Sequence, residues 1–502
     1  MSRVRLVLAV AASSTALLLA GCASGSSAVD STPAAGGGSI PVASAPASDG
    51  ALPELSSSAG ALSVTLTAAE SQVPYNGSTR WAMTYNGQVS GPTLRVRAGD
   101  TLRITLVNHL DQPTSLHTHG LHVSPEQDDP FTMVEPGQSR TYEYTIPKDQ
   151  QAGTFWYHPH VHTTTAEQVA SGLSGAIIVE NATDDALARV TTDRTLVIND
   201  PPLVQSNPWR DSRGASSAAP DHGSMMGDSS GGGMDSMMGM DGSGVDMMTA
   251  MVGRTGPRLL TNGRDGVALT GSSGRLERTH IVNATASTTL TLTYSGARMV
   301  ELATTGGRLP RPQDAAAITL APGERTEVVL VPSAQGGKLM AQRHSNEGAA
   351  GLTGLPELIA TTAADAGTDT SLLPTTMEAN SRDLFAPDVV VARQRVVTLD
   401  GHMNPTIDGR PFDAGRIDLT AAKGTVEEWV IRSNSPMAHP IHLHTWPFQV
   451  RGQEGWTDVV SVPANGEQVI RVAFDDFAGT TVLHCHILDH EDTGMMATIK
   501  VE

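Results

Sequence analysis

"VPANGEQVIRVAFDDFAGTTVLHCH" occupies residues 462–486. It begins with a turn rich in Pro, Asn and Gly, continues as a run in which apolar and polar residues alternate, and ends in His-Cys-His. The same plan occurs at 134–160 as "VEPGQSRTYEYTIPKDQQAGTFWYHPH". Alternation with a period of two residues predicts a strand with one buried face, and its recurrence predicts repeated β-domains.

A third copy, "LAPGERTEVVLVP" at 320–332, has the turn and the strand but no histidine pair. Alternation also marks 101–108, 289–294 and 425–431, and helical patterns are sparse apart from a short candidate at 164–173. Short strands between Gly/Pro turns are typical of antiparallel β-sandwiches. We therefore expect an all-β chain with three β-sandwich domains at 59–183, 190–362 and 390–502, and a linker at 363–389.

The chain has 502 residues, a formal net charge of −19 and no long basic run. An acidic surface repels the phosphate backbone, so we expect no nucleic-acid partner.

The N-terminus has the pattern of an export signal. Arg3 and Arg5 precede an apolar run that ends in "LAGC" at 19–22. We expect a signal peptide at 1–21, a lipid-bearing Cys22 and a flexible tether at 22–58, with the protein anchored on the extracytoplasmic side of a membrane. A simple secretory signal with an incidental Cys22 is the alternative. The other cysteine of the chain, Cys485, would then be a lone exported thiol, either reactive or bound.

Histidines gather in four clusters: "HTHG" (117–120), "HPH" (158–160), "HPIHLH" (439–444) and "HCHILDHEDTGMM" (484–496). Two histidines separated by one residue on a strand point to the same face, and a metal is a common partner of such a pair. One pair alone would be taken as surface histidines. Four clusters at matching places in two repeated domains predict metal ligands.

The donor types of the last cluster indicate copper. One thiolate, two imidazoles and a thioether are the donors of a blue copper site, whereas a structural zinc site uses more thiolates. Cys485, His490 and Met495 fit one loop around an ion, and His439 can approach from a neighbouring strand. The eight other histidines of the clusters suit a multinuclear copper centre: His117, His119, His158, His160, His442, His444, His484 and His486.

With these motifs the chain resembles the multicopper oxidase family, the laccases and copper-efflux oxidases, over about residues 60–502. The resemblance implies cupredoxin-like Greek-key domains and four copper ions, with substrate oxidised one electron at a time and dioxygen reduced to water. It assigns His439, Cys485, His490 and Met495 to a type 1 copper and a three-copper cluster to the space between the first and third domains. The cluster ligands would be His117 and His442 for type 2, and for the type 3 pair His119, His158 and His486 on one ion and His160, His444 and His484 on the other.

The resemblance also suggests proton-relay carboxylates. Glu491 follows His490, and Asp128 lies nine residues after His119, with Asp129 as its close rival. Solvated loop carboxylates are the alternative for both. Thr118 stands where the family often has Trp, a change that affects packing rather than ligation. His122 and His162 extend two clusters, and we interpret them as neighbours of the ligands or surface residues.

The electron donor remains open between Cu(I) and a phenol or aromatic amine. Thioethers prefer Cu(I), and an irregular segment at 211–257 is rich in methionine. Its methionines are Met225, Met226, Met234, Met237, Met238, Met240, Met247, Met248 and Met251. Met437 matches a methionine that copper-efflux oxidases use near type 1 copper, whereas Ser435 stands where an acidic residue would be expected.

We favour a cuprous oxidase that gives copper tolerance outside the cytoplasm, working as a monomer with dioxygen. A laccase-like oxidase is the first alternative. A copper-sequestering protein without turnover is the second, and the methionine segment could also be a plain disordered linker.

Overall fold

The computed structural model describes residues 50–205, 247–271, 273–344, 351–401 and 404–502. The chain divides into two units, Met1–Val42 and Ala43–Glu502, and every described residue belongs to the second. The predicted signal peptide, Cys22, most of the tether and six methionines of the methionine-rich segment (Met225, Met226, Met234, Met237, Met238 and Met240) lie outside the described residues. No helix in the described part of the chain is long and apolar enough to cross a membrane.

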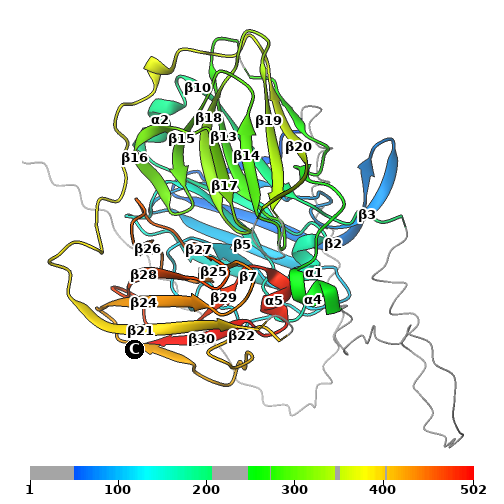
Figure 1. Ribbon diagram of the computed structural model, residues 1–502. Helices are drawn as coiled ribbons and strands as arrows, with labels where there is room; N and C mark the ends of the chain where they lie inside the picture. Colours follow the sequence, from blue (N-terminus) through cyan, green and yellow to red (C-terminus); the bar gives the residue numbers. More distant parts are fainter. Residues whose placement is uncertain (1–49, 206–246, 272, 345–350, 402–403) are drawn as a thin grey trace, which may run out of the picture. The chain divides into compact units, whose positions relative to one another are not determined.

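The first domain is a sandwich of two sheets, shown in blue and cyan in Figure 1. One sheet contains, in order, β3 (Ser78–Tyr85), β2 (Ala61–Tyr75), β5 (Thr101–Asn108) and β7 (Ser139–Thr145). The other contains β1 (Glu54–Ser56), β4 (Thr93–Arg97), β9 (Gly175–Glu180), β8 (Gly153–His158) and β6 (His117–His119). Alternating apolar residues of both sheets, such as Leu66, Ile104 and Ile177, form one buried core.

The second domain repeats this plan (green in Figure 1). Its first sheet is β11 (Leu260–Thr261), β10 (Thr191–Asn199), β13 (Leu276–Asn283), β18 (Arg325–Val331), β15 (Arg298–Thr304) and β16 (Gly307–Asp314). Its second is β12 (Val267–Leu269), β20 (Leu352–Thr362), β19 (Gly337–His344), β14 (Leu290–Tyr294) and β17 (Ala317–Leu320). Ile281, Leu292 and Leu339 belong to the core between them.

The third domain (yellow to red in Figure 1) closes the described chain with two five-stranded sheets. One is β22 (Thr406–Ile407), β21 (Val391–Asp400), β24 (Val426–Ser433), β28 (Glu467–Ala473) and β26 (Phe448–Val450). The other is β23 (Leu419–Ala421), β30 (Met496–Val501), β29 (Gly479–Cys485), β25 (His439–Leu443) and β27 (Val459–Val462). The prediction of an all-β chain built from three sandwiches is confirmed.

The sheets are mixed, not purely antiparallel as the sequence pattern suggested. In each domain a long first strand pairs in parallel with a later one, as β2 does with β5, β10 with β13 and β21 with β24. The strand from the repeated turn motif, β7, β18 or β28, then pairs antiparallel. A half-buried strand alternates with period two in either direction, so the pattern carries no information about strand direction.

Two connecting regions are more ordered than predicted. The tether ends before residue 58, because β1 pairs with β4 and Glu54 forms an ion pair with Arg95 at 2.8 Å. The linker contains the 3-10 turn η1 (Thr370–Leu372) and packs against both neighbouring domains. Met377 joins a core cluster of the second domain, and Leu384 joins one of the third.

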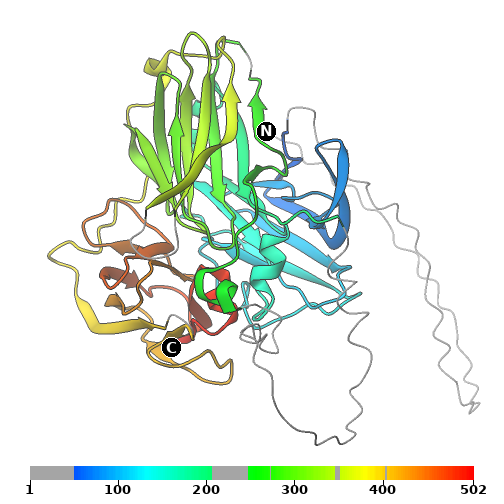
Figure 2. The ribbon, with the colours of Figure 1, turned by 45° about the vertical axis from the view of Figure 1, so that its right-hand side comes forward.

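The helices are short: α1 (Thr165–Ala170), α2 (Ala182–Leu187), α4 (Met247–Val252) and α5 (Leu488–Asp492). The first lies within the candidate segment 164–173. The segment rich in methionine ends in α4, although no helical apolar face is apparent in its sequence. Both views of the molecule place α4 beside the red α5 of the third domain, and the two helices pack together (Figures 1 and 2).

Candidate metal centre

Strand alternation sorts the histidines of the third domain between two sites. In the ladder of β25 and β29, Ile441 is opposite Cys485 and His442 is opposite His484. Residues opposite each other share a face, and neighbours along a strand point to opposite faces. Cys485 and Ile441 therefore face the core of the domain, together with His439, whereas His442 and His484 face away from it.

The core side carries the cysteine site, which we define as His439, Cys485 and His490 with Met495 beside them. The Sγ atom of Cys485 lies 3.6 Å from Nδ1 of His439 and 3.7 Å from Nδ1 of His490. Two ligands about 2.0 and 2.3 Å from one tetrahedral ion would be about 3.5 Å apart. Burial raises the pKa of the Cys485 thiol, so a metal ion is needed to hold it as thiolate.

Helix α5 folds the cluster "HCHILDHEDTGMM" around this site. The backbone N–H of Met495 donates to the carbonyl of His490 at 2.7 Å, and the N–H of Cys485 donates to the carbonyl of Met495 at 3.0 Å. Met495 is fully buried and shares a core cluster with Cys485 and Met437. The loop thus closes on itself, with Met495 and Cys485 joined by a backbone hydrogen bond and buried in one cluster.

The opposite side carries the eight-histidine site, which joins the first and third domains. Its members, each at most 3% exposed, are His117, His119, His158, His160, His442, His444, His484 and His486. In the first domain His117 of β6 is opposite His158 of β8, and in the third the matching pair is His442 and His484. The rings of His117 and His444 stack across the junction at 3.8 Å, as do those of His119 and His442 at 3.7 Å.

The ligand groups predicted by resemblance are each brought together in space. Nitrogens of His160, His444 and His484 all lie within 4.8 Å of one another. The rings of His119, His158 and His486 are 5.0 to 5.9 Å apart, and those of His117 and His442 are 5.5 Å apart. How copper ions divide among these residues stays a prediction.

Unpartnered nitrogens show that these residues fit metal ions. Nδ1 of His117 bonds Asp128, Nδ1 of His158 bonds the Pro159 carbonyl, and Nδ1 of His442 bonds the Asp458 carbonyl. Within the described chain, the Nε2 atoms of these three rings are buried and have no hydrogen-bond partner. An imidazole that donates through one nitrogen and offers the other to a shared space is the usual arrangement of a metal ligand.

The protonation states agree with this fit. Burial lowers the pKa of His160 to about 4 and that of His486 to about 3, with further lowering by the neighbouring His484. Burial likewise lowers the pKa of His117, His119 and His444. Neutral imidazoles are the form that binds metal ions.

Asp128 and Glu491 are buried carboxylates, so their interpretation as solvated loop residues is wrong. Oδ2 of Asp128 is 2.6 Å from Nδ1 of His117, and its other oxygen accepts from the N–H of Thr118 at 3.0 Å. Oε2 of Glu491 is 3.0 Å from Nδ1 of His484. Asp129, the rival of Asp128, is turned away and accepts from Phe131 N–H.

Burial raises the pKa of Asp128 to about 7. Burial also acts to raise the pKa of Glu491, but the imidazoles of His160 and His484 outweigh it and hold that pKa below its usual range. The two carboxyl groups thus sit at two edges of the eight-histidine site in different charge environments.

Comparison with known proteins finds relatives for the two domains that carry the histidines. Two protein-family models, both described as multicopper oxidase, match residues 67–184 and 386–502. These ranges fall in the two domains that carry the histidines. The multicopper oxidase mco of Staphylococcus aureus is 29% identical over 447 residues, 85% of each chain. The chain belongs to the multicopper oxidase family.

Structural similarity extends the relationship to the whole fold. A multicopper oxidase from Campylobacter jejuni, described as a metallo-oxidase, has a TM-score of 0.70 and 26% identity, covering 90% of this chain and 94% of its own. The prediction of cupredoxin-like domains is confirmed, and the chain is an oxidase. The cell division protein FtsP of Escherichia coli is also 27% identical over 405 residues, 77% of each chain.

One carboxylate of this multicopper oxidase was not foreseen from the sequence. Asp458 precedes β27, and its Oδ2 lies 2.9 Å from Nδ1 of His119 while its backbone carbonyl bonds His442. It belongs to no histidine motif. A charged residue directly before the apolar strand "VVSV" is the available signal in the sequence, and that signal is weak.

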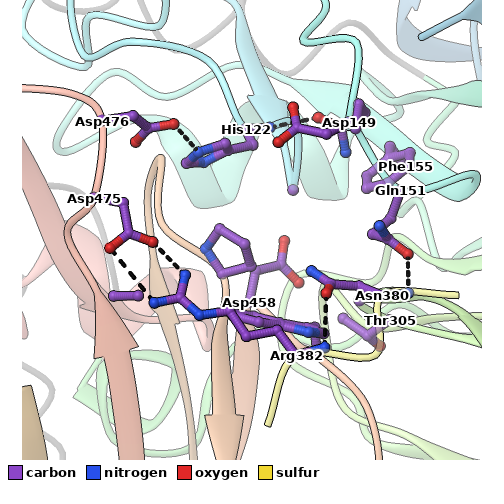
Figure 3. A pocket seen from close by; sticks show the side chains of 16 residues that line it. His122, Asp149, Gln151, Phe155, Thr305, Asn380, Arg382, Asp458, Asp475 and Asp476 are labelled. Carbon is purple, nitrogen blue, oxygen red and sulfur yellow. Dashed lines mark hydrogen bonds and ion pairs between the residues drawn. The ribbon is translucent and has the colours of Figure 1, made fainter. Parts of the chain in front are cut away.

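Asp458 also lines a pocket of about 300 Å³ where residues of all three domains meet (Figure 3). His122 of the first domain lines this pocket and bonds to the third domain on both ring nitrogens: Nε2 donates to Asp476 at 2.7 Å and Nδ1 donates to the Thr445 carbonyl at 2.8 Å. Arg382 of the linker pairs with Asp475 on the facing side. His122 is therefore a junction residue that contacts the third domain, and His162 packs its ring on Phe412 at 4.8 Å.

The cysteine site is covered on its outer side by α4. Nε2 of His490 donates to the carbonyl of Met251 at 3.1 Å. Arg254, just after the helix, pairs with Asp489 at 2.8 Å and also donates its backbone N–H to that carboxylate. The end of the methionine-rich segment is thus fixed against the residue next to a predicted ligand. The two positions compared above with copper-efflux oxidases are both buried: Met437 is 2% exposed and Ser435 is 1% exposed.

Proposed function

We propose that this multicopper oxidase oxidises Cu(I) to Cu(II) outside the cytoplasm, with four copper ions of its own. His439, Cys485, His490 and Met495 would hold one, and the eight-histidine site would hold three. Bound there, copper supplies one-electron oxidation of the donor and reduction of dioxygen with four electrons and four protons to two waters. Pure copper storage would not need eight convergent imidazoles between two domains.

The chain's own residues prepare both sites for this chemistry. Cys485 stands between His484 and His486, so a few covalent bonds join the cysteine site to the eight-histidine site. Burial of every ligand keeps bulk water from the reacting space. Asp128 and Glu491 would relay protons, because each sets a carboxylate oxygen beside Nδ1 of a predicted ligand, at 2.6 Å from His117 and at 3.0 Å from His484.

The observation that favours Cu(I) is the hydrogen bond from His490 to Met251. It places the end of a methionine-rich segment on the edge of the cysteine site, where a donor must deliver its electron. Thioethers bind Cu(I) in preference to harder ions. A helix over His490 also restricts the approach of a bulky phenol. The similarity to a metallo-oxidase supports a metal ion as donor.

Oxygen uptake by copper-loaded protein tests this proposal. Replacement of the six methionines between 225 and 240 by serine should lower kcat/KM for Cu(I) by about tenfold, equal to about 1.4 kcal/mol of lost binding, and spare 2,6-dimethoxyphenol. A matched control replaces six serines or glycines of the same segment by alanine. Equal activity of both variants with Cu(I), together with efficient phenol oxidation, would favour the laccase-like alternative. No uptake with either donor would refute both oxidase functions.

We also propose that Cys22 carries a lipid that anchors the protein on the extracytoplasmic side of a membrane. The support is the apolar run ending in Leu-Ala-Gly-Cys and the small-residue stretch after it. Cys22→Ala should move the protein from the membrane fraction to the soluble fraction. An unchanged membrane fraction would count against the anchor.

A further inference from the structure

A buried arginine of the second domain reaches the wall of the eight-histidine site. Arg325 begins β18 and is 1% exposed. Its Nε donates to the Thr154 carbonyl at 3.1 Å in the first domain, and its Nη2 donates to the Thr305 carbonyl at 2.8 Å in the second. Its Nη1 lies 2.8 and 3.1 Å from the two carboxylate oxygens of Asp458 in the third. One planar guanidinium thus contacts all three domains.

Asp458, the ion-pair partner of Arg325, contacts two predicted ligands, His119 and His442. Asp458 faces Nδ1 of His119 with its carboxylate at 2.9 Å and accepts from Nδ1 of His442 through its backbone carbonyl at 2.7 Å. Nη1 of Arg325 itself lies 3.1 Å from the same nitrogen of His119, so the position of Asp458 between them decides whether that nitrogen carries a proton. The two rings stack at 3.7 Å with an angle of 21° between their planes. Within the described chain, Nε2 of each ring is buried and without a hydrogen-bond partner. Protons fixed on both Nδ1 atoms leave both Nε2 lone pairs available to metal ions.

The motif "HTHG" provides the space for this contact. Gly120 has a φ of +90°, and a Cβ there would lie 2.3 Å from Nη2 of Arg325 and 2.6 Å from Oδ2 of Asp458. Any side chain would displace the pair from His119. The glycine that ends the motif is therefore explained by Arg325, a residue of the second domain, which supplies none of the predicted copper ligands.

We propose that Arg325 is a positioning residue, through which the second domain holds Asp458 and so fixes the orientation and tautomer of His119 and His442. The inference rests on the proposed function, because it concerns copper at the eight-histidine site. A carboxylate in this buried place would not keep its position without the guanidinium, since its only other side-chain partner among the described residues is His119. Arg325 touches neither substrate nor the reacting atoms.

Arg325→Lys is the first test, because it keeps the positive charge but loses the planar fork that contacts three domains. We expect copper at the eight-histidine site to be held about 10- to 100-fold more weakly, measured by copper content after dialysis against a graded series of EDTA. The blue absorption of the cysteine site should persist, and the electron paramagnetic resonance signal of the non-blue copper should be lost or altered.

Arg278→Lys is the matched control. Arg278 is an equally buried arginine of the same domain, paired with Asp184, Asp193 and Glu327 instead of a residue that contacts a predicted ligand. Its replacement should lower the thermal unfolding midpoint without changing the ratio of copper at the two sites. Equal loss of both kinds of copper in both variants would reduce Arg325 to a structural residue and overturn the inference.

Asp458 gives a second, independent test in case Arg325→Lys fails to fold. Asp458→Asn keeps an oxygen that can accept from His119, whereas Asp458→Leu removes it. We expect the Asn variant to retain clearly more copper at the eight-histidine site than the Leu variant. Equal retention in the two, or full retention in Arg325→Lys, would overturn the inference. A wild-type chain that binds copper at the cysteine site alone would instead refute the proposed function.

Discussion

At the residue scale, spacing in the sequence reveals ligands but not the residues that orient them. His117 and His119, or His484 and His486, are separated by one residue, so the alternation of a strand alone predicts that they act together. Asp458 and Arg325 lie 133 residues apart and belong to no such pattern. Only the packing of three domains brings them to His119, and local periodicity carries no information about that packing.

Glu491→Gln should lower turnover about 100-fold or more, the scale of a lost general acid or base. The amide keeps the shape of the side chain beside His484 but cannot take up and release a proton. Oxygen uptake measures the effect, and copper content and blue absorption should stay at wild-type values. Asp129→Asn serves as the control, since Asp129 accepts hydrogen bonds within its own turn. Wild-type turnover in Glu491→Gln would remove the relay role.

At the element scale, the alternation of apolar and polar residues predicted where the strands lie better than it predicted which strands pair and in which direction. The segment 101–108 coincides with β5, and the repeat at 320–332 contains β18. The direction of pairing was not accessible, because parallel and antiparallel strands alternate alike. Helix α4 was missed for another reason. It is held in place by α5, through the hydrogen bond from His490 to Met251 and the contact of Arg254 with Asp489, and its own sequence does not show these contacts. A helix this short gains little from its own propensity.

Arg254→Ala should free α4 from α5 and expose the edge of His490. We expect kcat/KM for 2,6-dimethoxyphenol to rise about tenfold, if release of the helix removes about 1.4 kcal/mol of obstruction, while the blue absorption stays unchanged. Steady-state oxygen uptake measures the change. Arg258→Ala is the control, because Arg258 is an exposed neighbour that pairs with Asp265 instead. An equal effect of the two substitutions would show that α4 does not restrict the donor.

At the scale of the whole molecule, each of the three sandwiches has its own core, but the eight-histidine site lies at the junction between two of them. The repeats in the sequence predict three sandwiches, and the histidines predict which two of them face each other. The residues that join the domains, His122, Asp458 and Arg325, could not be predicted from the sequence. Their charged groups pair across domain boundaries, where neither partner's sequence neighbourhood indicates the other.

The pairing of His122 with Asp476 should make stability depend on pH. Burial lowers the pKa of His122, but its bonds to Asp476 and the Thr445 carbonyl, with help from Asp149, outweigh this and raise that pKa above 6.5. The contribution to stability is therefore complete below about pH 6.5 and is lost as pH rises through the higher folded-state pKa. It should amount to about 1 kcal/mol or less, because Asp476 is half exposed.

Thermal unfolding of His122→Gln and wild type between pH 6 and pH 9 measures this effect. The wild type should unfold at the higher temperature at pH 6, and the difference should shrink toward pH 9. His109→Gln, at an exposed histidine of the same domain, should show no such trend. A difference that stays constant or grows with pH would contradict the raised pKa of His122.

The eight-histidine site draws half of its residues from positions 117–160 and half from positions 442–486. More than 280 residues, including the whole second domain, must be synthesised and folded between the two halves. During synthesis the first half alone presents four imidazoles without a complete site, and contacts of such long sequence separation form late in folding. Copper loading therefore has to follow completion of the last sandwich. Timing of metal delivery is set by the order of the domains along the chain.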